Sequence, residues 1–307
     1  MTQQSGMSSS QIAAISVIVP TFNHARFLKQ ALQSIIEQSH QNWEAIIVNN
    51  FSTDETLQII ESFNESRFKV VNFQNNGVIA ASRNEGIRRS SAPFIAFLDS
   101  DDVWYSEKLS RCLVELENGN DLVCHGERWV SADTRQRNIV YGPSSNATHD
   151  KLLFKGNCLS TSATIVRRDI LNKVGGFSED STFTTAEDYE LWLKISQITS
   201  SFVFVDEILG EYRRHELGAS SSVIRHLNAE LAVVEQHISH AQKKDIFSFK
   251  ARNRKAKAIY SAGRTCMRVR EHRLASSFFL RAIIKSPFFV RSYAALALTV
   301  ARWVVRK

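Results

Sequence analysis

An alternation of short apolar runs with amphipathic segments over the first 100 residues constrains the fold more than any other feature of the chain. The β-branched run at 15–19 ends at Pro20, as is typical of a buried parallel strand. From 27 to 36 the apolar residues follow the 3.6-residue period of a helix. Further strands are expected at 45–48, 68–73 and 93–98, with helices through 57–60 and over 80–89 between them. This order predicts a doubly wound α/β sheet.

Polar side chains follow these predicted strands, at the edge where a doubly wound sheet binds its ligand. Thr21 and Asn23 follow the first strand, Asn49 and Asn50 follow the second, and Asp99 follows the last. The sequence has neither a GxGxxG run after a strand nor a GxxxxGK[ST] run, which disfavours a NAD enzyme and a P-loop NTPase. The polar residues at the strand ends are therefore the first candidates for a binding site.

Three carboxylates, Asp99, Asp101 and Asp102, come directly after the last predicted strand of this series. Oxygen ligands at this density suit Mg²⁺ or Mn²⁺, ions that also bind substrate phosphates. A solvated turn or a helix cap would use the same residues. Repulsion between carboxylates at the end of a buried strand is relieved by a cation or by protonation, which favours a metal site.

A second acidic pair, Glu187 and Asp188, begins a predicted helix whose apolar face includes Trp192. The helix dipole favours carboxylates in a first turn, so capping is one interpretation of the pair. In the other interpretation Asp188 is a general base that takes the proton of an acceptor hydroxyl. Trp192, and Trp104 after the acidic cluster, are either core residues or an aromatic surface for the acceptor.

A basic segment at 213–215 follows the strand-like run at 202–205. Arg213, Arg214 and His215 suit the neutralisation of a diphosphate or the completion of a metal shell. An exposed basic turn is the alternative. The segment taken alone favours neither interpretation. The capping-box pattern at 52–55 is clearer, and it predicts that a helix begins there.

Several of these segments, in this order, resemble glycosyltransferase family 2, whose members have the GT-A fold and invert the anomeric centre. The segments that carry the resemblance are 15–23, 76–77, 81–87, 97–104, 187–193 and 212–215. They are similar to the family's nucleotide loop, its N-x-G and A-R-N-x-G-I segments, its DxD block, its acidic catalytic helix and its Y-R-x-H segment. The resemblance covers about the first 220 residues and implies a Rossmann-like, doubly wound mixed sheet with an α-helical extension after it.

The resemblance also implies a reaction and roles for single residues. A nucleoside-diphosphate sugar binds with Mn²⁺ or Mg²⁺ on its diphosphate, and an acceptor hydroxyl attacks with inversion. The implied catalytic residues are Asp188, as the base, and Glu187, and the implied metal residues are Asp99, Asp101 and His215. The implied nucleotide-sugar-binding residues are Pro20, Thr21, Asn23, Asn49, Asn50, Asp54, Arg83, Asp99, Ser100 and Arg213. The residues expected to bind the acceptor are Trp104 and Trp192.

One segment departs from the family pattern. Where the family has two acids that contact the nucleotide, this chain has Asn49 and Asn50, followed by Phe51. An Asn carbonyl accepts a hydrogen bond from the base, but the amide is neutral and its NH₂ also donates, so base preference is expected to shift or loosen. A nucleotide-sugar-binding protein without turnover is the alternative that this departure raises.

Charge divides the chain in two. Residues 226–307 carry 17 Lys and Arg against 4 Asp and Glu, a net charge of +13, so the rest of the chain carries −6 of the total of +7. We expect a disordered tail at 1–13, a catalytic domain at 14–225 that ends in a linker-like stretch at 215–225, and a basic α-helical accessory region at 226–307. Residues 288–307 mix apolar side chains with cations. This composition suits an interfacial helix on an anionic membrane or a helix docked on the catalytic domain.

Location and partners follow from the same observations. The four cysteines are dispersed, which suits a reducing compartment, and no apolar run approaches the 18 residues of a membrane-spanning helix. We expect a cytoplasmic enzyme, peripheral at the inner membrane face, that uses a glycan or lipid-linked acceptor in cell-surface polysaccharide synthesis. A nucleic-acid-binding protein that uses the basic helices is the competing class. It leaves the acidic motifs unexplained, so no nucleic-acid partner is expected.

Overall fold

The computed structural model describes residues 13–131, 136–215, 222–240 and 244–304. Within these ranges the strands form one mixed sheet of order β3-β2-β1-β4-β8-β6-β9-β5, with β7 paired to β6. The strands are β1 Ile15–Thr21, β2 Trp43–Asn49, β3 Phe68–Asn72, β4 Phe94–Phe97, β5 Val103–Trp104, β6 Leu122–Ser131, β7 Gln136–Ile139, β8 Thr164–Arg167 and β9 Phe202–Arg214. The predicted doubly wound sheet is confirmed.

The parallel half of the sheet is built from the apolar runs at the start of the chain. β1 pairs in parallel with β2 and with β4, and β2 pairs in parallel with β3. This register places Thr21 beside Asn49, and Asn49 beside Asn72, so the carboxyl ends of the strands meet at one edge.

The strand expected at 202–205 is much longer than the sequence pattern indicates. β9 continues to Arg214 because it pairs in parallel with β6 beyond two register shifts. The basic segment at 213–215 therefore lies at the end of a strand, and its interpretation as an exposed turn is wrong.

Side chains from β1 alternate between the two faces of the sheet. Ile15, Val17 and Val19 belong to one core cluster with helix α1, whereas Ile18 belongs to a second cluster on the face that α3 covers. A Cβ on Gly86 of α3 would lie 2.5 Å from a methyl carbon of Ile18, so this glycine allows the close approach of helix and strand. The helices around the sheet are α1 Ala25–Ile36, α2 Thr56–Ser62, α3 Ile79–Arg89, α4 Lys108–Glu117, α5 His149–Lys155, α6 Arg168–Val174 and α7 Glu187–Ile198.

The helix predicted to follow the capping-box pattern at 52–55 is confirmed, but Ser52 does not cap it. Helix α2 begins at Thr56, and the Ser52 hydroxyl accepts a hydrogen bond from the backbone N–H of Asn23 at 2.9 Å instead of capping the helix. Asp54 is the residue that binds the start of this helix: its carboxylate accepts hydrogen bonds from the backbone N–H of Thr56 at 3.1 Å and from that of Ala25 at 3.0 Å. One carboxylate thus joins the starts of α1 and α2.

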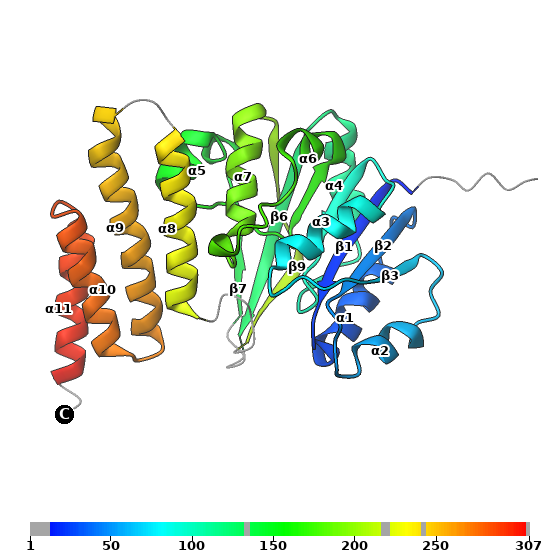
Figure 1. Ribbon diagram of the computed structural model, residues 1–307, viewed down its shortest axis with the longest axis horizontal. Coiled ribbons are helices and arrows are strands. Elements are labelled where there is room, and N and C mark those ends of the chain that lie inside the picture. Colours follow the sequence, from blue (N-terminus) through cyan, green and yellow to red (C-terminus); the bar gives the residue numbers. More distant parts are fainter. Residues whose placement is uncertain (1–12, 132–135, 216–221, 241–243, 305–307) are drawn as a thin grey trace, which may run out of the picture.

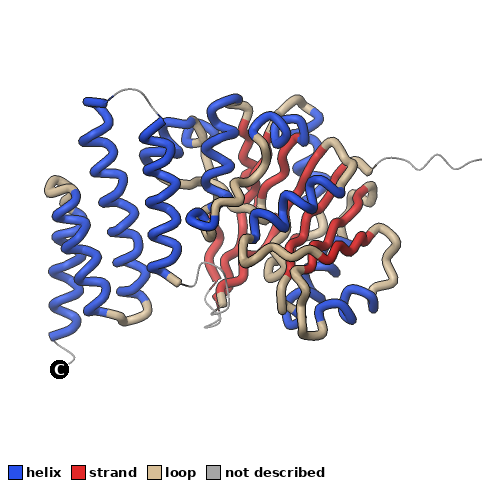
Figure 2. The backbone as a smooth tube through the Cα atoms, in the orientation of Figure 1, coloured by secondary structure: helices blue, strands red, loops and turns tan. Residues whose placement is uncertain are grey.

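The C-terminal part of the chain is helical, as predicted (Figure 1). Its helices are α8 Val223–His240, α9 Lys244–Arg268, α10 His272–Lys285 and α11 Arg291–Val304. Figure 2 shows strands on one side of the molecule and only helices on the other. In the part of the chain that is described, no helix is both long enough and apolar enough to cross a membrane.

Helix α8 joins the two parts. Its Ala229, Val233 and Val234 are buried in the core cluster of the sheet, and its Leu227 is buried in the cluster formed with α9, α10 and α11. The division at residue 225 stays a prediction. Residues 1–12 of the expected tail and 216–221 of the expected linker lie outside the described residues.

Candidate active site

A buried arginine joins three elements at the carboxyl edge of the sheet. Arg83, from α3, is 3% exposed and donates to a carboxylate oxygen of Asp99 at 2.7 Å and to one of Glu187 at 2.6 Å. Burial alone would lower the pKa of Arg83, but the two carboxylates outweigh it and raise this pKa. Burial raises the pKa of Asp99 in spite of the arginine. The bridge connects the end of β4 to the first turn of α7.

A second pair lies at the same edge. The Nε2 atom of His215 is 2.8 Å from a carboxylate oxygen of Asp101, and the Phe27 ring stacks on the imidazole at 4.3 Å between centroids. Burial would raise the pKa of Asp101, but the hydrogen bond with His215 and the nearby imidazole of His24 lower it. Nδ1 of His24 is 2.8 Å from the hydroxyl of Ser100. The pair offers an ionised carboxylate next to an imidazole.

The third acid of the cluster has a structural position. Asp102 is buried, and its carboxylate accepts from the Ser162 hydroxyl at 2.6 Å and from the backbone N–H of Arg213 at 2.9 Å. Burial, with the neighbouring acids Asp101 and Glu127, raises its pKa well above the usual value. Asp102 therefore anchors the acidic loop to β9.

Asp188 lies in the first turn of α7, next to Glu187. One carboxylate oxygen accepts from the Thr161 hydroxyl at 3.1 Å, and the other accepts from the backbone N–H of Tyr189 at 2.7 Å. Burial, together with the charge of Glu187, raises the pKa of Asp188 to about 6. The group is mostly ionised at neutral pH and is still close enough to that pH to take up a proton.

The residues that follow β1 and β2 do come together, but most of their polar atoms are already used. Asn49 is buried; its NH₂ donates to Asn72 at 2.8 Å and its carbonyl accepts from the backbone N–H of Ser52 at 3.1 Å. The Asn50 carbonyl accepts from the backbone N–H of Asn75 at 3.0 Å. Both side-chain carbonyls therefore hold loops through one hydrogen bond each, and each has a second lone pair. The acceptance of a hydrogen bond from the base stays a prediction.

The loop after β1 is closed by Asn23, which has a positive φ of 50°. Its side-chain carbonyl accepts from the backbone N–H of Thr53 at 2.8 Å. Pro20 and Thr21 are buried at the end of β1, and the Thr21 hydroxyl has no hydrogen-bond partner in the part of the chain that is described. The Asn23 carbonyl is therefore already in use, and the Thr21 hydroxyl, although unpaired among the described residues, is buried.

Arg213 does not present a free guanidinium. Its side chain donates to the Gln30 side chain and to the backbone carbonyl of Asp101, and it lies over the Phe27 ring at 5.6 Å. The arginine therefore fastens the acidic loop to α1.

The expected role of Trp104 and Trp192 in acceptor binding is not supported. Both rings belong to core clusters, with exposures of 3% and 0%. The indole N–H of Trp104 donates to the backbone carbonyl of Ser162 at 2.7 Å, and Lys108 lies 3.4 Å from the centre of its ring. Neither ring has a face to offer to a sugar.

Two hydroxyl residues that the sequence analysis missed position the acids. Thr161 holds Asp188, and Ser162 accepts from the backbone N–H of Asp99 at 3.1 Å while it donates to Asp102. The run of hydroxyl residues at 160–162 just before β8 is a weak signal for them.

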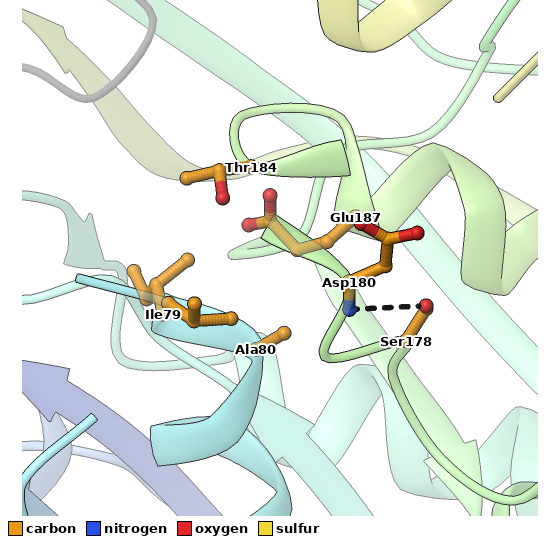
Figure 3. Close-up of a pocket in the computed structure, with 7 residues that line it drawn as sticks. Ile79, Ala80, Ser178, Asp180, Thr184 and Glu187 are labelled. Atoms are coloured by element: carbon orange, nitrogen blue, oxygen red, sulfur yellow. Dashed lines mark hydrogen bonds between the residues drawn. The ribbon is translucent and has the colours of Figure 1, made fainter. Parts of the chain in front are cut away.

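A small hollow adjoins the Arg83 bridge. It lies between the start of α3 and the segment before α7, with Glu187 reaching toward it (Figure 3). Its lining residues are Val78, Ile79, Ala80, Ser178, Asp180, Thr184 and Glu187. Its lining is apolar on the side of α3 and carries hydroxyl and carboxylate oxygens on the side of the segment before α7.

The donor set for a divalent cation is small. Among the described residues, no group of three or more His, Cys, Asp and Glu side chains is arranged to hold a metal ion. Asp101 and His215 nevertheless supply a carboxylate oxygen and an imidazole nitrogen side by side, and Nδ1 of His215 is buried without a hydrogen-bond partner. The carboxylate oxygen suits Mn²⁺, and the imidazole nitrogen is a common ligand of first-row transition metals. Asp99, the third residue expected to hold the metal, has one of its two carboxylate oxygens hydrogen-bonded to Arg83.

Comparison with known proteins places the chain among glycosyltransferases. It is 27% identical over 228 residues to WfgD of Escherichia coli, a UDP-Glc:alpha-D-GlcNAc-diphosphoundecaprenol beta-1,3-glucosyltransferase, covering 74% of this chain and 87% of that protein. It is 29% identical over 203 residues to TuaG of Bacillus subtilis, a glycosyltransferase assigned to teichuronic acid biosynthesis, covering 65% of this chain and 78% of that one.

Solved structures match over nearly the whole chain. The S. aureus TarS fragment 1-349 in complex with UDP-GlcNAc matches with a TM-score of 0.64 at 20% identity, covering 93% of this chain and 88% of that one. The mannosyltransferase PcManGT of Pyrobaculum calidifontis, in complex with GDP-Man and Mn²⁺, matches with a TM-score of 0.61 at 17% identity, covering 96% and 81%. These likenesses confirm the predicted GT-A fold. Residues 16–175 match the family described as Glycosyl transferase family 2, and the chain belongs to that family.

Proposed function

We propose that the protein transfers a sugar from a nucleoside-diphosphate sugar to an acceptor hydroxyl with inversion at the anomeric carbon. The observation that carries this proposal is the Arg83 bridge. It ties Asp99, in the acidic loop beside the Asp101–His215 pair, to Glu187, the neighbour of Asp188. The groups proposed to bind the diphosphate and to act as the base are linked in this way by a buried ion pair at one edge of the sheet.

Asp188 is the proposed base. As the acceptor oxygen attacks the anomeric carbon, its proton passes to the Asp188 carboxylate, and the bond from that carbon to the diphosphate breaks with its electron pair going to the leaving phosphate oxygen. The hydrogen bond from Thr161 fixes the direction of the carboxylate. A pKa of about 6 leaves Asp188 ionised at neutral pH, as a base must be.

Asp101 and His215, with the remaining oxygen of Asp99, are the residues proposed to hold Mn²⁺ or Mg²⁺. The ion would supply positive charge against the phosphate oxygens of the leaving group. Without it, the cations of this edge are already engaged: Arg83 pairs with two carboxylates and Arg213 with Gln30 and a backbone carbonyl. That engagement is a reason to propose a metal-dependent enzyme.

The remaining residues at this edge divide into two proposed roles. The NH₂ groups of Asn23 and Asn50 and the hydroxyl of Thr21 are proposed to face the nucleotide. The other side chains are proposed to hold loops in place, because their polar atoms are bound within the protein. These are Asn49, Asp54, Arg83, Ser100 and Arg213, while Pro20 is a buried residue of β1. A nucleobase with an acceptor atom for the NH₂ group of Asn50 would suit this arrangement better than a nucleobase that needs two carboxylates as acceptors.

The acceptor is proposed to be a glycan or a lipid-linked glycan of the cell surface, at the cytoplasmic face of the membrane. The relation to WfgD and TuaG supports this class. The hollow beside Glu187 is the proposed approach for its hydroxyl, since it adjoins the first turn of α7.

Calorimetry with UDP, GDP, dTDP and CMP sugars, with and without Mn²⁺, tests the donor part of the proposal. We expect one nucleotide class to bind only with the metal and Asp101→Ala to lose that binding, while Asp169→Ala, which removes an exposed carboxylate of α6, keeps it. Absence of binding by every donor would remove the enzyme proposal. A binding protein without turnover is the second candidate, favoured by the engaged Asn49 and Asn50 carbonyls, and it predicts donor binding without release of nucleoside diphosphate.

A further inference from the structure

The hairpin of α10 and α11 exposes large apolar side chains around its connecting turn. Ile284, Phe288 and Val290 are 76%, 80% and 73% exposed. Leu280, one helical turn before Ile284, is also exposed, and Phe249 of α9 places its ring 6.2 Å from the ring of Phe288. These five residues are called the hairpin patch below.

The hairpin patch is separate from the apolar face that packs the hairpin. Ala275, Phe278, Phe279 and Ala282 of α10 are buried in the cluster shared with α9. Since residues 278, 279 and 282 share one side of the helix, 280 and 284 project from the other side. Helix α10 therefore has a second apolar side, which stays exposed in the described part of the chain. Several large apolar side chains exposed close together in the chain, with the Phe249 and Phe288 rings in contact, indicate an interaction site.

The charge around the hairpin patch restricts the partner. From 272 to 307 the sequence has seven Lys and Arg and neither Asp nor Glu. Three of these cations, Arg281, Lys285 and Arg291, are exposed within or next to the patch. A second copy docked on the same surface would bring these like charges together, and the segment 272–307 supplies no acid to pair them, which disfavours self-association. A polyanion without hydrocarbon would leave the exposed Ile284 and Phe288 in water.

We propose that the hairpin patch binds the surface of an anionic membrane. Ile284, Phe288 and Val290 enter the boundary between headgroups and acyl chains, while Arg281 and Lys285 reach the lipid phosphates. Long cationic side chains beside apolar residues are suited to such a boundary, because their stems are apolar and their ends are charged. The hairpin lies at one end of the molecule, with α8 and α9 between it and the sheet (Figure 1). Membrane binding and donor binding therefore use different surfaces.

Flotation of the full-length protein with vesicles tests this proposal without any donor. The vesicles are phosphatidylcholine alone, or phosphatidylcholine with 30% phosphatidylglycerol, a composition chosen to supply negative charge. We expect the protein to float with the anionic vesicles at low salt and to bind the neutral ones at least tenfold more weakly. The double variant Ile284→Ser/Phe288→Ser should lose binding by at least tenfold, and Arg281→Gln/Lys285→Gln should lose roughly tenfold on anionic vesicles only.

The matched control is Val114→Ser/Ile198→Ser, which removes two exposed apolar side chains from the sheet domain. It should bind like the wild type, and thermal melts of all variants establish that each is folded. Failure of the wild type to float with anionic vesicles would overturn the proposal, as would equal binding by Ile284→Ser/Phe288→Ser. A wild-type dimer in light scattering that Ile284→Ser/Phe288→Ser converts to a monomer would also overturn it, in favour of self-association. Because calorimetry with donors uses no lipid, failure here leaves the proposed transfer reaction untouched.

Discussion

The carboxylate of Asp101 and the imidazole of His215 lie 2.8 Å apart, although 114 positions separate them in the chain. Strand β9 produces this contact, because it runs beside β6 to Arg214 and ends next to the acidic loop after β4. The Phe27 ring covers the imidazole and fixes its plane. The pair is therefore built by three separate elements of the fold.

If His215 is a ligand of the divalent ion, His215→Ala should weaken Mn²⁺-dependent donor binding by at least tenfold. Calorimetry at several Mn²⁺ concentrations measures this loss. The matched control is His149→Ala on α5, whose imidazole lies 3.2 Å from the Gln197 amide away from the site. Equal metal dependence in wild type and His215→Ala would contradict the proposed ligand.

Arg83 should be the most costly residue of the site to remove. In Arg83→Met the carboxylates of Asp99 and Glu187 lose their shared partner in a buried place, and such losses cost about 3–5 kcal/mol of unfolding free energy. Urea unfolding measures the change. Arg83→Lys keeps the positive charge but cannot donate to both carboxylates as a guanidinium does. Its unfolding free energy should therefore lie between those of wild type and Arg83→Met. If the unfolding free energy of Arg83→Met lay within about 1 kcal/mol of the wild-type value, well below this range, the bridge would not be a major support of the fold.

Catalysis should depend on the ionisation of Asp188. Burial and Glu187 raise its pKa to about 6, and a base acts only when it is deprotonated. The value of kcat/KM should therefore rise with pH up to about 6 and level off above it, when measured with saturating metal. Thr161→Val removes the hydroxyl that donates to the charged carboxylate, so the midpoint should move to higher pH. An unchanged pH profile in Thr161→Val would show that the group that titrates in the profile is not Asp188.

Lys108 should destabilise the folded protein. It is fully buried, its Nζ has no hydrogen-bond partner in the described ranges, and burial lowers its pKa to about 7. As the pH falls from about 10 toward 7, the unfolded chain takes up the proton first, so wild-type stability decreases over this window. Lys108→Met should therefore be more stable by about 1–3 kcal/mol at pH 7 and by less at pH 10. The exposed Lys173→Met is the control, and a Lys108→Met protein less stable than wild type at pH 7 would contradict this account.

The sequence predicted the sheet well, because the strands of a parallel sheet are continuous apolar runs and the helices between them keep a strict period. The acidic residues Asp99, Asp101 and Asp102 were found for a related reason, because they stand directly after a strand. The length of β9 could not be predicted, since its second half shows neither a continuous apolar run nor a strict alternation and is defined by pairing with β6.

The partners of the acids were also hidden from the sequence. Arg83 reaches Glu187 across 104 positions, and the hydroxyls of Thr161 and Ser162 belong to a loop without periodicity. The burial of Trp104 follows from its place between α4 and the loop before β8, a tertiary relation that its position after the acidic cluster does not reveal.

The most direct test of the account compares wild type with Asp188→Asn, using the donor that calorimetry identifies and a lipid-linked glycan fraction as acceptor. Donor affinity and release of nucleoside diphosphate are measured on the same samples. The account predicts a donor affinity within about twofold of wild type and a rate of transfer reduced at least a hundredfold, the range expected when a general base is lost. Transfer by Asp188→Asn at a rate close to that of wild type would contradict it.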